Sequence, residues 1–272
     1  MNSTKNRIDG WRYYNHAAIP SIPEYKNPDL SPIEDGRIWS IDNKKPLLVR
    51  WTTDFDSDVE TNFWYVIKDK PFDIDSLSSH YRNQIKKGVK NFEVKEIDQF
   101  KYGKELIEIQ QSAFSVYSNH IHTKIEEKPF SCGKYFGSFY KETGQLCGYI
   151  ITFENEKEIN FNSMRTIPKY EKQGISEALI YGMLCYYSND LLNGKYITDG
   201  ARNINHKTNF QNYLEKKFGF RKAYCKLHVK YHHVMYIAVK LLYPFRKIIK
   251  NQRISGILTM EEIVRKEAKN EK

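Results

Sequence analysis

The sequence predicts an α+β fold in which a mixed, mostly antiparallel sheet is flanked by helices. Strand-like segments at 135–140, 146–153 and 159–164 follow one another with short polar turns between them, which is typical of antiparallel strands. A helix is then expected after the third strand, because apolar residues recur from Ile175 to Tyr186 at the i, i+3, i+4 spacing of a single helix face.

The remaining elements suggest three regions along the chain. Residues 1–99 form an N-terminal region with strands near 47–53 and 63–67 and a helix that Asp75 would cap. Residues 100–234 contain the antiparallel strands, and residues 235–272 form a helical C-terminal tail divided by Pro244.

Composition favours anionic partners. The net charge is +10 and the pI is about 9.2, which suits a phosphate-bearing cofactor, a nucleic acid or an anionic membrane surface. The four cysteines form no C-x-x-C pair, and the chain has neither an apolar leader segment nor a run of about 18 apolar residues. We therefore expect reduced thiols and a cytoplasmic location.

The segment 161–192 predicts an anion site, since a strand, a glycine-containing turn and a helix start follow one another there. Free N–H groups of the first helical turn point outward, and the helix dipole favours negative charge at that end. Gly174 would let a ligand approach the backbone because it has no Cβ. The backbone groups expected to hold the anion are those of Lys172, Gln173, Gly174, Ile175 and Ser176.

Two further groups of residues are candidates for binding or catalysis. Arg82, Lys86 and Lys87 could hold a diphosphate or a carboxylate through charge-assisted hydrogen bonds, or they could form a solvated helix face. Asp199 ends a predicted strand, where ligands of open α/β sheets gather, so it is a candidate base as well as a candidate turn residue.

No metal site is expected. His228, His232 and His233, and the pair His120 and His122, have no acidic or cysteine partner at a familiar interval. The C-terminal tail combines apolar and basic residues, so it could pack on the core or make peripheral contact with a membrane.

The order of these elements resembles the acyltransferases of the GNAT superfamily. Their diagnostic turn, [Arg/Gln]-x-x-Gly-x-[Gly/Ala], corresponds here to residues 171–176, with Glu171 at the first position and Ser176 at the last. A second family pattern is matched by Asn209 and by Gly219-Phe220, while Glu215 occupies the usual tyrosine position and Tyr213 lies nearby.

The upstream part is similar to the Fem-type branch of the same superfamily. Residues 82–87, Arg-Asn-Gln-Ile-Lys-Lys, follow the predicted strand that carries Trp64, as in that branch, and Asp199-Gly200 at a strand end is also Fem-like. The resemblance implies a GNAT-like domain over residues 100–234 and an incomplete GNAT-like half within 1–99.

The resemblance implies an N-acyltransferase that moves an acyl group from acyl-CoA, such as acetyl-CoA, to an amine on an amino sugar or a bacterial cell-envelope precursor. The turn and Asn209 would hold the coenzyme; Asp199, Tyr213 and Glu215 would be the catalytic candidates; and Arg82, Lys86 and Lys87 would bind the acceptor. Two alternatives remain: a Fem-like aminoacyltransferase that uses aminoacyl-tRNA, and a non-catalytic binding protein on a GNAT scaffold.

Overall fold

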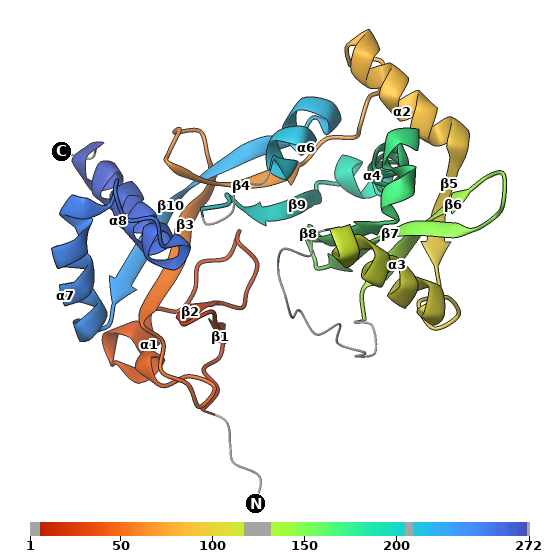
Figure 1. Cartoon of the computed structure of the whole chain (residues 1–272). Helices are drawn as coiled ribbons and strands as arrows, with labels where there is room; N and C mark the ends of the chain where they lie inside the picture. The colour runs from red at the N-terminus through yellow and green to blue at the C-terminus, as the bar shows by residue number, and fades with distance from the viewer. Residues whose placement is uncertain (1–5, 117–131, 205–208, 271–272) are drawn as a thin grey trace, which may run out of the picture. The chain divides into compact units, whose positions relative to one another are not determined.

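The computed structural model describes residues 6–116, 132–204 and 209–270 and divides the chain into two compact units (Figure 1). Unit 1 takes its residues from Met1–Tyr65, Ala201–Asn209 and Lys222–Lys272, and unit 2 takes its residues from Val66–Gly200 and Phe210–Arg221. The predicted boundaries near 100 and 235 each fall inside a unit, because the chain passes between the units several times.

Unit 2 contains the antiparallel strands predicted from the sequence. They are β6 (Lys134–Tyr140), β7 (Leu146–Glu154) and β8 (Glu158–Thr166). β5 (Phe92–Ile97) pairs antiparallel with β6, and β9 (Tyr196–Ala201) pairs parallel with β8, which gives the order β9-β8-β7-β6-β5. The mixed, mostly antiparallel sheet is confirmed.

The helices of unit 2 are α2 (Ser79–Asn91), α3 (Gly103–Val116), α4 (Ile175–Tyr186), α5 (Ser188–Leu192) and α6 (Phe210–Phe218), with a 3₁₀ turn η2 (Pro168–Gln173) before α4. The prediction that Asp75 opens the first helix is wrong. Ser78 holds the N-cap position of α2, and its carbonyl oxygen accepts a hydrogen bond from the Arg82 N–H.

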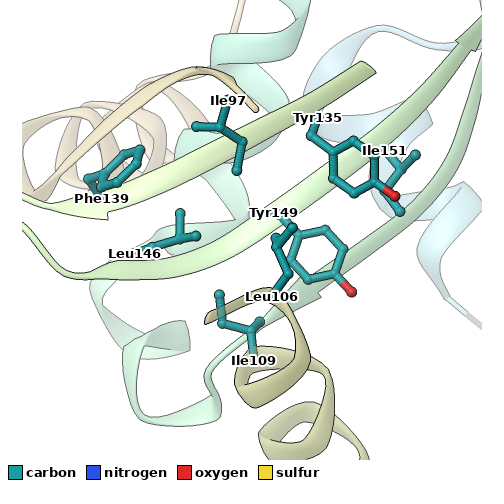
Figure 2. Close-up of a cluster of buried hydrophobic side chains, with 8 residues drawn as sticks. All are labelled: Ile97, Leu106, Ile109, Tyr135, Phe139, Leu146, Tyr149 and Ile151. Carbon is teal, nitrogen blue, oxygen red and sulfur yellow. The ribbon is translucent and has the colours of Figure 1, made fainter. Parts of the chain in front are cut away.

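One face of the unit 2 sheet is covered by α3 (Figure 2). Leu106 and Ile109 of this helix are almost completely buried against side chains of β5, β6 and β7. The other members of this core are Ile97, Tyr135, Phe139, Leu146, Tyr149 and Ile151. α4 also packs against these strands with its predicted apolar face, so the sheet is covered by helices as expected.

Unit 1 is a second strand-and-helix body. Its strands are β1 (Trp11–Tyr14), β2 (Ala17–Pro20), β3 (Leu48–Ser57) and β10 (Arg221–Tyr231), in the order β1-β2-β3-β10, and β4 (Phe63–Lys68) begins in it. Its helical segments are α1 (Ser31–Glu34), η1 (Arg37–Trp39), α7 (His233–Leu242), η3 (Tyr243–Phe245) and α8 (Gln252–Asn270).

The C-terminal helix belongs to the core of unit 1. Met260 and Ile263 of α8 are buried together with Ala17, Leu48 and Leu227. The choice between core packing and membrane contact concerns residues 235–250, of which Val239 of α7 is buried. Among the described residues, no helix has the length and apolar character needed to cross a bilayer.

Candidate functional site

The predicted strand, turn and helix form the first part of the site. Pro168 begins the 3₁₀ turn after β8, and Gly174 ends it with φ of 88° while serving as the N-cap of α4. Glycine suits this junction because, without a Cβ, it adopts a positive φ at little steric cost. The helix then runs from Ile175 with its N-terminal N–H groups at the turn, as the sequence predicts.

Helix α2 lies directly against this turn. A Cβ added at Gly88 of α2 would lie 2.3 Å from the carbonyl oxygen of Gly174, and a Cβ added at Gly174 would lie 2.9 Å from the Cα of Gly88. Lys87 Nζ donates to the carbonyl of Lys172 at 2.8 Å, and Asn91 Nδ2 donates to that of Gln173 at 3.0 Å. Helix α2 therefore occupies the space beside the Gly174 backbone that a ligand was expected to enter.

The side chain of Glu171 folds back over the same turn. Its carboxylate accepts a hydrogen bond from the Thr166 hydroxyl, and its Oε2 accepts a second from Ser176 Oγ at 3.0 Å. A carboxylate beside the first turn of α4 is also favoured by the helix dipole. Glu171 thus supplies a negative charge at the place where the sequence predicts an external anion.

The basic residues proposed for acceptor binding differ in their surroundings. The guanidinium of Arg82 donates to the carbonyl oxygens of Leu77 and Asp75 at 3.0 and 3.2 Å, so it braces the turn that precedes α2. Lys87 is bonded to the turn before α4, and Lys86 is exposed.

The second part of the site is a separation of two strands. β8 and β9 run parallel and pair Glu158 with Tyr196, Ile159 with Ile197 and Asn160 with Thr198. Within the described residues, no pairing between these two strands continues beyond Asn160 and Thr198. Beyond that pair, the Gly200 N–H donates to Thr198 Oγ1 at 2.9 Å, so this part of β9 is bonded within its own strand and not to β8.

Asp199 is the residue that follows the last pair on β9. It is half-buried, and burial raises its pKa to about 6 against an opposing hydrogen bond from Gln211. Half of such carboxyl groups would be ionised near pH 6, which is suitable for a general base at neutral pH. The strand runs on to Ala201, so Asp199 lies within β9 and not at its end as the sequence predicted, and its role remains a proposal.

Helix α6 lies beside the separation. The ring of Phe210 packs at 5.7 Å from that of Phe161, the β8 residue that follows the last pair, and Tyr213 stacks on Phe210 at 6.0 Å. Burial and the nearby Glu177 carboxylate raise the pKa of Tyr213, so its hydroxyl is a weaker acid than that of an ordinary tyrosine. Glu215 is half-buried on the same helix.

A buried ion pair joins α4 to α6, and sequence reasoning missed it. Lys217 Nζ lies 2.6 Å from Glu177 Oε1, and the two side chains are only 8% and 14% exposed. Lys217 also lies 4.5 Å above the ring of Tyr213. An acidic residue in the first turn of a helix, such as Glu177, is favoured by the helix dipole and could have been noted from the sequence. Nothing in the spacing of the residues indicated that Lys217 would be its partner.

Two predictions concern residues at the margins of the described structure. Asn209 is exposed immediately before α6. His120 and His122 lie outside the described residues. Among the residues that are described, no group of three or more His, Cys, Asp or Glu side chains is arranged to hold a metal ion.

No protein-family model and no curated protein sequence matches the chain. Solved structures do match its fold, which is GNAT-like and of the Fem type. The C-terminal domain of a candidate lysylphosphatidylglycerol synthetase from Agrobacterium fabrum aligns with a TM-score of 0.52 at 12% identity, over 85% of this chain and 82% of that one. FemX aligns with a TM-score of 0.52 at 9% identity, over 85% of each chain.

A protein of unknown function from Bacteroides thetaiotaomicron aligns with a TM-score of 0.51 at 10% identity, over 78% of each chain. At these identities the likeness establishes the fold alone, so the chemistry has to be argued from the residues of this chain.

Proposed function

We propose that this chain is an acyltransferase that moves an acyl group onto an amine. The observation that carries the proposal is Asp199, a half-buried carboxyl with a raised pKa placed where β8 and β9 separate. In open α/β sheets, ligands bind near the carboxyl ends of parallel strands, and Asp199 lies in the C-terminal half of β9, directly after its last pair with β8.

The reaction would proceed by direct attack. The amine nitrogen forms a bond to the donor's carbonyl carbon, the bond from that carbon to the leaving group breaks, and the amine loses a proton. Asp199 would accept that proton, directly or through water, and the protonated hydroxyl of Tyr213 would supply one to the leaving group.

For the donor, we propose an aminoacyl ester carried by tRNA. An acyl-CoA would need its diphosphate on the turn before α4, but Glu171 supplies a carboxylate there and Gly88 of α2 lies against Gly174. A second anion at this place would meet charge repulsion. The net charge of +10 suits a polyanionic donor, and FemX and the lysylphosphatidylglycerol synthetase domain share the fold.

Acyl-CoA remains the second candidate. Gly174 with its positive φ and the free amides of α4 keep the geometry of an anion-binding turn, provided that Glu171 turns outward when a coenzyme arrives. The acceptor in either case is proposed to be an amine on a sugar or on a cell-envelope precursor.

The donor can be identified by comparing two titrations under the same conditions. We expect charged total tRNA to bind saturably with a steep dependence on salt, and acetyl-CoA to give no calorimetric signal. Transfer of a radiolabelled aminoacyl group to an amino-sugar acceptor would then be measured with the wild type and with Asp199→Asn. Acetyl-CoA binding without tRNA binding would favour the second candidate, and an absence of both would favour a non-catalytic protein on this scaffold.

A further inference from the structure

Helix α7 and the following turn η3 expose an apolar stripe. The stripe begins with Val234, Ile237 and Leu241, which recur at intervals of three or four residues and so share one face of α7. It continues with Phe245 in η3 and Ile248 in the turn that follows. Val234, Ile237, Leu241 and Ile248 are 73%, 59%, 66% and 72% exposed. The solvent-exposed face of a surface helix normally carries polar residues, whereas the exposed face of α7 is apolar.

The orientation of α7 is fixed by residues on its opposite side. Val239 is buried, at 4% exposure, and Met235 and Leu242 are partly buried. α7 therefore already packs on unit 1 through one apolar face, and the exposed stripe is a second apolar face of the same helix.

Every charged side chain within residues 233–250, the segment that carries the stripe, is basic. No Asp or Glu occurs between Glu215 and Glu261, whereas exposed Lys240, Lys247 and Lys250 lie in or next to the stripe. Arg246, the fourth cation of residues 233–250, is paired with Glu262 of α8 at 3.3 Å, which neutralises that carboxylate and helps to hold the segment on α8.

We propose that this stripe and its three lysines form a docking surface for an anionic lipid bilayer. Apolar side chains flanked by lysines and without acids are what an interfacial helix presents to acidic headgroups. α7 has 10 residues, about 15 Å of helix, so it would lie in the interface and not cross the bilayer. Self-association through the same face would bring the lysines of two copies together, and their repulsion disfavours it.

The test is co-sedimentation of the full chain with vesicles. Vesicles of phosphatidylcholine alone are compared with vesicles in which a third of the lipid is phosphatidylglycerol. We expect binding to the second kind, at least about tenfold tighter than to the first, and loss of most of it at high salt. Equal binding to both kinds, or binding to neither, would overturn the proposal.

Matched variants separate the surface from general properties of the chain. Leu241→Asp should weaken binding to the anionic vesicles by about tenfold or more, while Leu192→Asp should leave it unchanged, since Leu192 of α5 is equally exposed at 69%. Replacement of Lys240, Lys247 and Lys250 by Gln should weaken binding, whereas the same replacement of Lys45, Lys101 and Lys104 should not.

Folding and self-association are checked on the same samples. Circular dichroism of Leu241→Asp should match the wild type, because the side chain it replaces faces water. If that variant does not fold, the lysine replacements carry the test alone. If sedimentation without vesicles shows a wild-type dimer that Leu241→Asp abolishes, the face is a protein interface and the membrane proposal is wrong.

Discussion

The turn before α4 and the separation of β8 from β9 are two places in unit 2 where a ligand could be held, and they differ in what occupies them. At the turn, polar and backbone groups find partners within the chain: Glu171 bonds Ser176, and Lys87 and Asn91 bond the turn's carbonyls. At the separation, β8 and β9 are not paired with each other beyond Asn160 and Thr198, the Gly200 N–H bonds only its own strand, and burial raises the pKa of Asp199. A sequence pattern can thus mark a structural junction while the chemistry lies elsewhere.

The largest expected effect tests whether the turn is a packing junction. Gly174→Ala should lower the free energy of unfolding by about 3–4 kcal/mol, because it adds a contact with Gly88 to the strain of a positive φ. Gly144→Ala is the matched control: its φ is 70° and nothing lies within 4 Å of the added Cβ, so we expect a loss of only about 1 kcal/mol. Chemical denaturation measures both, and equal losses would contradict tight packing at Gly174.

The next effect concerns the ion pair that joins α4 to α6. Lys217→Met should cost about 3 kcal/mol of stability, because it leaves the Glu177 carboxylate buried without its partner. The double replacement Lys217→Met with Glu177→Leu should recover at least half of that loss, as measured by a double-mutant cycle. Additive losses in the cycle would mean that the two charges are not coupled.

Asp199→Asn should change activity and stability in opposite directions. The rate of acyl transfer should fall by about 100-fold or more, as expected when a general base is removed. Stability at pH 7 should rise by about 1–2 kcal/mol, because the pKa of Asp199 is raised from 3.8 to about 6 and the folded state therefore disfavours the ionised form.

The sign of this effect fixes its pH dependence. The ionised carboxylate of Asp199 lowers the free energy of unfolding of the wild type at neutral pH. This destabilisation should disappear as the pH falls from about 6 to 4, because the carboxyl becomes protonated first in the folded and then in the unfolded state. The gain of Asp199→Asn should therefore shrink over that range, and the wild-type rate should fall as the pH drops through about 6. A gain that stays constant from pH 4 to pH 7 would argue against a raised pKa.

The smallest effect is at Glu171. If its carboxylate excludes a diphosphate, Glu171→Gln should raise the affinity for acetyl-CoA by about tenfold while changing stability by less than about 1 kcal/mol. Thr143→Gln, in the exposed turn between β6 and β7, is a control that should leave the affinity unchanged. No gain in affinity would indicate that α2, and not the charge, closes the turn.

The sequence predicted what depends on local pattern. The three antiparallel strands, the apolar face of α4 and the glycine at its start all follow from spacing over a few residues, whereas β9 continues two residues beyond Asp199, where the sequence predicted its end. Contacts between distant segments were not predictable, and Gly88 against Gly174 and Lys217 with Glu177 are the two that matter most. The start of α2 was misplaced because Asp75 and Ser78 are both acceptable caps and only packing selects between them.

Met260 and Ile263 pack with Ala17 and Leu48, so the hydrophobic core of unit 1 joins the earliest and the latest described parts of the chain. During synthesis on a ribosome, all residues of unit 2 would be available once Arg221 has emerged. The core of unit 1 would remain incomplete until α8, which contributes Met260 and Ile263, has been made. β3 and β10 would meanwhile expose apolar surface, which makes unit 1 the part of the nascent protein that is most in need of a chaperone.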